Sequence, residues 1–141
     1  MLSGAGSDVE PIPAVTTPSA PDTARESTGH LVATPDAAVE TVSRLKDLLD
    51  WYDGDGRMRY GDSAEDVVHD NGRRAGFATR AVVSYAEHTG LLNDHNDEYP
   101  ATAIADLLGD LRHLADSLGL DYAELDHRGQ DHYVSELHDE S

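Results

Sequence analysis

The side chains with the clearest chemical potential in this sequence form a row of three, Asp106, Asp110 and His113. They are four and three residues apart, so on a helix they lie on one face. Carboxylates and imidazoles bind divalent metals, which makes the row a weak candidate metal site. The leucines of the same segment lie nearly opposite, however. We therefore expect the row to face solvent or a partner, and we predict no metal ion, no cofactor and no catalytic residue.

Residues 53–57 read Asp-Gly-Asp-Gly-Arg and begin like the calcium-binding loop of an EF-hand. That loop requires an oxygen ligand at its fifth position, glycine at its sixth and glutamate at its twelfth. Counted from Asp53, these positions hold Arg57, Met58 and Ala64. Because the pattern fails at all three, we interpret the segment as an acidic turn.

Composition argues against enzymes and nucleic-acid binders. The chain has no cysteine, and it contains neither a Gly-x-Ser-x-Gly motif nor a glycine-rich phosphate loop. Its 28 Asp and Glu residues outnumber 10 Lys and Arg residues, which gives a formal net charge of −18 over 141 residues. Such a surface repels other polyanions. We expect a non-enzymatic protein that acts through a protein partner, without direct contact with nucleic acid or membrane.

The kind of acidity suggests an environment. Lys46 is the single lysine, and Asp outnumbers Glu about two to one. Short, well-hydrated carboxylates suit a solvent of molar salt, where the Debye length of about 3 Å screens their repulsion. The sequence therefore favours a halophilic host or its virus.

No segment resembles a membrane span or a secretory signal. No apolar run approaches the roughly 18 residues that a span requires. The N-terminus lacks both the basic and the apolar region of a signal peptide. We expect a cytoplasmic protein, or a virion component assembled in the cytoplasm.

The chain divides into an arm and a helical domain. Residues 1–33 are rich in Ser, Thr, Pro, Ala and Gly and have no helical or strand period, so we predict a flexible or extended arm. Its apolar residues Val9, Ile12 and Val15 are candidate contacts for a partner. Residues 34–141 form the predicted domain, an all-α compact bundle of four to five helices.

Local signals place these helices. The first is expected to begin at Thr34 and end at residues 53–56. The second begins at Ser63 and either breaks at residues 70–72 or continues as one bent helix to Gly90; Ala78, Val82 and Tyr85 share its expected apolar face. Residues 91–100 are expected to form a polar loop. The third helix runs from Pro100 to Gly119 and the fourth begins at Asp121.

Two buried faces are expected near the C-terminus. The helix from Pro100 carries one apolar stripe that we expect to pack in the core, with Leu111 at its centre. On the last helix, Tyr122, Leu125, Gly129, Tyr133 and Leu137 align, and Gly129 is expected to let a neighbouring helix approach closely. The stripe consists of Ile104, Leu107, Leu108, Leu111, Ala115 and Leu118.

Residues 105–121 are similar to the C-terminal part of the all-α nucleoside triphosphate pyrophosphohydrolases (MazG-like). The resemblance implies a related helical fold. Enzymes of that family bind magnesium with Glu-Glu-x-x-Glu on one helix and Glu-x-x-Asp on a facing one. This chain has no Glu-Glu-x-x-Glu, and Asp106 and Asp110 have a different spacing.

A longer stretch, residues 62–138, resembles small acidic helical proteins of viruses and mobile elements of haloarchaea and high-GC actinobacteria. Residues 99–100 (Tyr-Pro), 106–113 and 131–133 (Asp-His-Tyr) carry this likeness. The resemblance implies no particular biochemical activity. From it, together with the acidic composition and the arm, we expect either a virion component or a regulatory accessory protein.

Two alternative functions remain open. A DNA-mimicking decoy could inhibit a nucleic-acid-binding enzyme by presenting its carboxylates as a row of phosphates. A degenerate pyrophosphohydrolase would instead require Asp106 and Asp110 to face other carboxylates. The carboxylates of the decoy row would be Asp106, Asp110, Asp121, Glu124 and Asp131.

Overall fold

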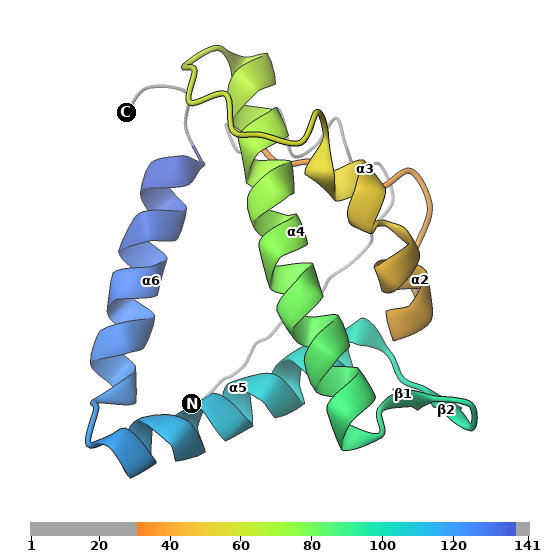
Figure 1. Cartoon of the computed structure of the whole chain (residues 1–141). Coiled ribbons are helices and arrows are strands. Elements are labelled where there is room, and N and C mark those ends of the chain that lie inside the picture. Colours follow the sequence, from red (N-terminus) through yellow and green to blue (C-terminus); the bar gives the residue numbers. More distant parts are fainter. Residues whose placement is uncertain (1–30, 138–141) are drawn as a thin grey trace, which may run out of the picture.

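The described part of the chain is built from helices. The structure, a computed structural model, describes residues 31–137. The all-α class predicted from the sequence is confirmed there, since a hairpin of two very short strands is the single sheet in this range (Figure 1). The elements are α2 (Val42–Asp47), α3 (Leu49–Asp53), α4 (Ala64–Thr89), β1 (Leu92–Asn93), β2 (Asn96–Asp97), α5 (Pro100–Leu118) and α6 (Tyr122–Glu136).

The first helix begins later than the sequence predicts. Helix α2 starts after Thr41, whose side chain accepts a hydrogen bond from the Arg44 N–H. A distant segment stabilises the first turn of α2. The Val42 N–H donates to the Glu98 carbonyl, and the Asp97 carboxylate accepts hydrogen bonds from Ser43. The prediction of a start at Thr34 is wrong, because these partners lie more than fifty residues away and satisfy the first free N–H groups.

Helix α4 is continuous from Ala64 to Thr89, so the alternative of one long helix holds and residues 70–72 do not break it. Both of its predicted ends are confirmed. Ser63 caps the first turn by accepting from the Asp66 N–H at 3.1 Å, and Gly90 ends the helix in the left-handed conformation, with φ of 87°.

The buried face of α4 is rotated from the expected one. Val82 is buried as predicted, but Ala78 is exposed and Tyr85 is half-buried. Gly76 lies on the buried face, where a Cβ atom would come within 3.0 Å of the Tyr52 Cβ. This glycine allows α3 to pack closely on α4, and that contact decides which side of α4 is covered.

Helices α5 and α6 have the ends that the sequence predicts. Pro100 occupies the first turn of α5, and Gly119 stops the helix with φ of 72°. The Leu120 N–H then donates to the Ala115 carbonyl at 2.8 Å, as in a Schellman motif. Asp121 caps α6 by accepting from the Ala123 N–H at 3.0 Å.

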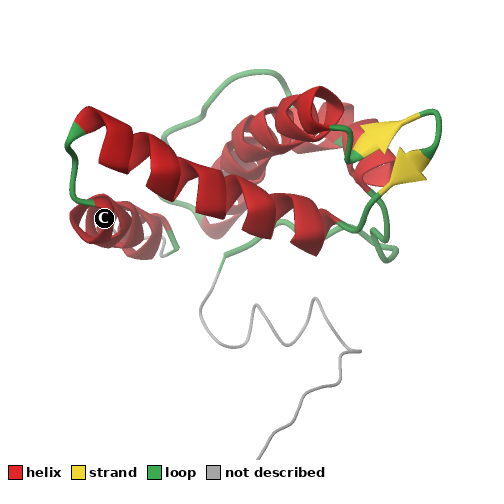
Figure 2. Cartoon of the chain, turned by 90° about the horizontal axis from the view of Figure 1, so that it is seen from below, coloured by secondary structure: helices red, strands yellow, loops and turns green. Residues whose placement is uncertain are grey.

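The core lies in one half of the described region, among α2, α4, the start of α5 and the hairpin. Residues 91–100, expected to form a loop, contain this hairpin, which projects beyond the helices (Figure 2). Helix α6 turns back from the end of α5 toward the first turns of α4 (Figure 1). The buried cluster comprises Val42, Leu45, Val82, Val83, Ala86 and Ala103.

The last residues of the predicted arm contact the helices. The Leu31 N–H donates to the Leu137 carbonyl at 3.2 Å, and the Leu31 carbonyl accepts from the Asn71 side chain at 2.9 Å. The candidate arm contacts Val9, Ile12 and Val15 lie outside the described residues. Within residues 31–137, no helix combines the length and apolarity needed to cross a bilayer.

Candidate functional site

The structure places Asp106, Asp110 and His113 on α5, and all three are exposed. Asp110 accepts a hydrogen bond from the Tyr85 hydroxyl of α4 at 2.5 Å. Across residues 31–137, no three His, Asp or Glu side chains come close enough together to hold a metal ion. The row therefore provides one link between α4 and α5, and its remaining side chains face solvent.

The Tyr85–Asp110 hydrogen bond changes the acidity of the phenol. It is the main cause that raises the pKa of Tyr85 to about 12, with smaller contributions from burial and from the charges of Asp110 and Asp106. An ionised phenol would lose this hydrogen bond and face two carboxylates. Tyr85 is therefore a hydrogen-bond donor at physiological pH, which suits a structural link between helices.

A second polar network, which the sequence analysis missed, surrounds Asp70 at the start of α4. Asp70 is 3% exposed, and its carboxylate accepts from the Arg59 N–H at 2.9 Å and from the Tyr60 N–H at 2.7 Å. His69 Nδ1 lies 2.9 Å from the same carboxylate, and His69 Nε2 lies 3.0 Å from Asp55 Oδ1. These contacts hold the loop between α3 and α4 against the helix.

The acidity of Asp70 follows from these contacts. Burial by itself raises the pKa of Asp70, but the hydrogen bonds from the Arg59 N–H, His69 and the Tyr60 N–H outweigh it and lower the pKa. An aspartate beside a histidine resembles part of a catalytic triad. Here the far nitrogen of His69 faces Asp55, where a triad would place a nucleophile, so the network stabilises the loop.

The acidic turn at residues 53–57 is tied to α4. Asp53 pairs with Arg80 at 2.8 Å, and its carbonyl accepts from Arg73. Asp55 pairs with Arg59 at 3.3 Å and contacts His69. The interpretation as a turn without calcium-loop spacing agrees with this geometry, in which both carboxylates are already engaged by cationic or imidazole groups.

The most unusual surface of the described region is apolar and lies on α5 and α6. Eight of the twelve exposed large hydrophobic side chains fall between residues 104 and 134. We call the α5–α6 surface the set Ile104, Leu108, Leu111, Leu114 and Leu118 on α5, Leu120 in the turn, and Tyr122, Leu125, Gly129 and Tyr133 on α6. Its isoleucine and leucines on α5 are 39–62% exposed.

This exposure corrects the expectation that the stripe of α5 packs in the core around Leu111. The first half of α5 contacts α4 and the core through the buried Ala103, the partly buried Leu107 and the Asp110 link. In its second half, Ala115 is the one member of the stripe that is buried among the described residues, at 3% exposure, beside the contacts with α6. A helix of 19 residues is about 28 Å long, so its second half extends beyond α4. Leu111 is consequently 39% exposed.

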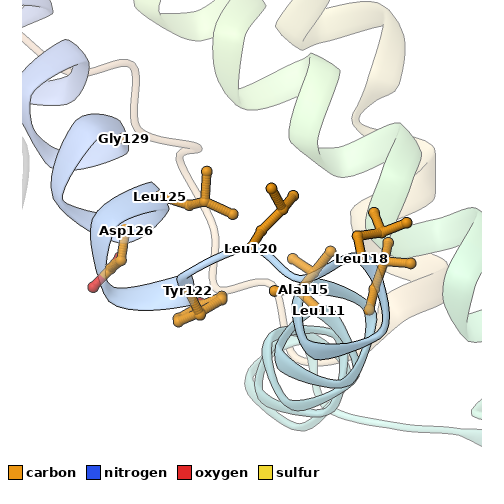
Figure 3. A pocket seen from close by; sticks show the side chains of 9 residues that line it. Leu111, Ala115, Leu118, Leu120, Tyr122, Leu125, Asp126 and Gly129 are labelled. Carbon is orange, nitrogen blue, oxygen red and sulfur yellow. The ribbon is translucent and has the colours of Figure 1, made fainter.

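Helices α5 and α6 form an apolar corner in the middle of this surface. The corner holds a pocket of about 310 Å³, lined on α5 by Leu111 and Leu118 and on α6 by Leu125. In Figure 3, Leu120 and Leu125 point into the space between the two helices, and the Asp126 carboxylate points away from it. The pocket therefore presents hydrocarbon to solvent.

Gly129 lies on the apolar side of α6, but the expected close approach of a neighbouring helix is wrong for the described residues. Within residues 31–137, a Cβ atom at Gly129 would meet nothing within 4 Å. Helix α6 is joined to α4 at its end instead, where Glu136 pairs with Arg74 at 3.3 Å and its carbonyl accepts from Asn71 at 2.6 Å. The middle of α6 is left uncovered by the described residues.

Comparison of the chain with protein-family models, with curated proteins and with solved structures finds no match in any of the three. The two resemblances seen in the sequence therefore depend on their own motifs, and the candidate site depends on its geometry.

Proposed function

We propose that this chain is a non-enzymatic, acidic helical protein that acts by binding a protein through the α5–α6 surface. The observation that carries the proposal is the exposed row of large aliphatic side chains on α5, with the apolar corner beside it. Soluble proteins rarely leave contiguous apolar patches of this kind uncovered, and those that do use them for binding.

The biological setting proposed here follows from composition. An Asp-rich chain with a net charge of −18 and one lysine suits a halophilic host or its virus. Within such a host the chain would be a virion component or an accessory protein. The arm, with Val9, Ile12 and Val15, would add an extended contact to the one made by the helices.

The geometry favours this function over both alternatives. A decoy would need its carboxylates in one row, but they are divided between α5 and α6, which run in different directions (Figure 1), and Asp121 is engaged as a helix cap. A pyrophosphohydrolase would need facing carboxylates, but Asp110 faces the phenol of Tyr85. Neither alternative explains the exposed leucines.

The test compares what co-purifies with three tagged chains expressed in the native host: the unchanged chain, Leu108→Asp and Ser117→Asp. Both variants add one carboxylate to α5, the first on the apolar surface and the second on the exposed polar side. We expect Leu108→Asp to lose an associated protein, or extra copies of the chain itself, that Ser117→Asp retains. Identical associations for all three chains would contradict the proposed function.

A further inference from the structure

The exposed stripe of α5 has the spacing of a helix-pairing seam. Ile104, Leu108, Leu111, Ala115 and Leu118 follow one another at intervals of four, three, four and three residues. This repeat of 3.5 residues keeps the apolar side chains on one side of the helix. Four of the five are exposed, whereas Ala115, at 3% exposure, is already covered within the chain. No described part of the chain covers the exposed leucines of this line.

The charges beside the seam indicate which partner it fits. The positions flanking it hold Ala105, Leu107, Arg112, Leu114 and Gly119, without a carboxylate among them. In paired helices the flanking positions select the partner by charge. A seam made for a basic helix would carry Asp or Glu at these positions, and in a chain of net charge −18 such residues are abundant.

The acids of α5 lie on the other side of the helix. At about 100° per residue, Asp106, Asp110 and Asp116 all point away from the seam. Arg112 is engaged within the chain, where its guanidinium lies 4.3 Å from the centre of the Tyr122 ring. Two copies can therefore approach along the seam with their α5 carboxylates turned away from each other, whereas a cationic helix laid along α5 would find no carboxylate at the flanking positions.

Gly129 is consistent with a second copy. It lies on the apolar side of α6, and no described residue comes within 4 Å of the place where a Cβ atom would be. A helix of another molecule can therefore come close to the backbone there. In a two-fold dimer the same patch of each copy meets its counterpart, and this is the commonest arrangement among soluble homo-oligomers.

From these observations we infer that the chain forms a homodimer, in which the α5–α6 surface of one copy packs against the same surface of a second copy. The inference rests on the proposed function and names the first partner of its binding surface. Because the rest of each molecule is strongly acidic, long-range repulsion opposes association at low ionic strength and salt screens it. Dimerisation should therefore strengthen as KCl is added.

Sedimentation of the full-length chain, over micromolar to hundred-micromolar concentrations and in 0.1, 0.5 and 2 M KCl, tests the inference. We expect twice the 15.2 kDa mass of one chain, with a dissociation constant that falls as salt rises. Leu108→Asp should raise the dissociation constant by at least about tenfold. Ser117→Asp, which adds the same charge on the polar side, should leave it unchanged.

Circular dichroism is the check that each variant remains folded. If Leu108→Asp loses helicity, Leu118→Asp, at a position that is 62% exposed, takes its place. A monomer at every concentration and salt would overturn the inference, as would a dimer that neither Asp substitution on the seam weakens. The chain could instead prove monomeric in sedimentation while Leu108→Asp still abolishes binding of a native partner. That result would overturn the homodimer but support the proposed function, because a different protein would then occupy the α5–α6 surface.

Discussion

At the scale of single residues, Asp70 is the polar group on which the loop before α4 depends most. Its buried carboxylate accepts two backbone N–H groups and contacts His69. One of those N–H groups belongs to Tyr60, which has the positive φ of 54° that non-glycine residues rarely adopt. The hydrogen bond to Asp70 helps to hold Tyr60 in that conformation, so the carboxylate links the backbone of the loop to the helix.

We expect Asp70→Asn to lower the free energy of unfolding by about 1–3 kcal/mol, because the amide leaves a buried N–H without an acceptor. The loss should depend on pH. The pKa of Asp70 is lowered in the folded state, so its stabilisation is present above the ordinary aspartate pKa of about 3.9 and is lost as the pH falls through the folded value.

Urea unfolding at several pH values measures this difference. The unchanged chain and Asp70→Asn should differ most near pH 7 and converge below about pH 3.9. Asp94→Asn, at an exposed position in the hairpin turn, is the matched control and should change stability by less than about 0.5 kcal/mol. Equal effects of the two substitutions at pH 7 would contradict the structural role of Asp70.

The Tyr85–Asp110 link leads to a second prediction at this scale. Removing the carboxylate with Asp110→Ala should bring the pKa of Tyr85 from about 12 toward the ordinary tyrosine value near 10. Ultraviolet titration detects the change, because one phenol that ionises at high pH in the unchanged chain would ionise at a lower pH in the variant. Tyr85→Phe removes this high-pH ionisation step and so assigns it to Tyr85. Asp116→Ala, on the same helix, should leave the step unchanged. A late step that persists in Asp110→Ala would show that another cause raises the pKa.

At the scale of the helices, sequence signals and structure agree where the chemistry is local. Ser63, Gly90, Pro100, Gly119 and Asp121 all lie at the ends that the sequence predicts. Each acts on N–H or carbonyl groups within a few residues, so its neighbours in the sequence are enough to identify its role.

The disagreements arise where distant segments decide. Thr34 and Thr41 are both plausible caps, and only the contacts of Glu98 and Asp97 with the start of α2 distinguish them. The sequence predicts the apolar stripe of α5 correctly, but it does not predict which of these side chains are buried. Burial depends on how much of α5 lies against α4, and this is set by the arrangement of the helices. Asp70 was missed because its partners are backbone groups of a loop, which no residue pattern encodes.

The glycines of two helices provide a test at this scale. A Cβ at Gly76 would lie 3.0 Å from the Tyr52 Cβ, close to the backbone of α3, whereas a Cβ at Gly109 would meet none of the described residues within 4 Å. We expect Gly76→Ala to destabilise the fold by forcing α3 away from α4. Gly109→Ala should stabilise it by about 0.5–1 kcal/mol through helix propensity alone. Chemical denaturation measures the free energy of unfolding of both variants. If Gly76→Ala stabilised the fold as much as Gly109→Ala does, the close packing of α3 on α4 would be contradicted.

At the scale of the whole molecule, the net charge of −18 is an unfavourable contribution to stability that depends directly on salt. We expect 2 M KCl to raise the melting temperature, relative to 0.1 M KCl, by at least about 5 °C, because salt screens the repulsion of −18 charges. The same comparison with the Leu108→Asp chain, in which dimerisation is weakened, separates screening from dimerisation.

A variant that combines Asp36→Asn, Asp94→Asn and Asp116→Asn removes three negative charges at exposed positions. Its melting temperature should rise less between 0.1 M and 2 M KCl than that of the unchanged chain. An unchanged or lower melting temperature in 2 M KCl would argue against the halophilic setting.

The boundary between arm and helices is the last feature of the whole molecule that can be tested. The sequence places it at residue 33, but Leu31 is hydrogen-bonded to Leu137 and to Asn71, and a Cβ at Gly72 would lie 3.2 Å from the Ala33 Cβ. Residues 31–33 thus contact both α4 and the end of α6. Removing them breaks two hydrogen bonds and uncovers part of α4.

We therefore expect two shortened chains to behave differently. A chain that begins at Leu31 should keep the helical signal and melting temperature of the full chain, because the described contacts are all retained. A chain that begins at Thr34 should melt roughly 4–8 °C lower, the shift that about 1 kcal/mol produces in a domain of this size. Circular dichroism melts in the same salt measure both. Equal melting temperatures would place the boundary at residue 33, as the composition alone suggests, and would show that the contacts of Leu31 add nothing to stability.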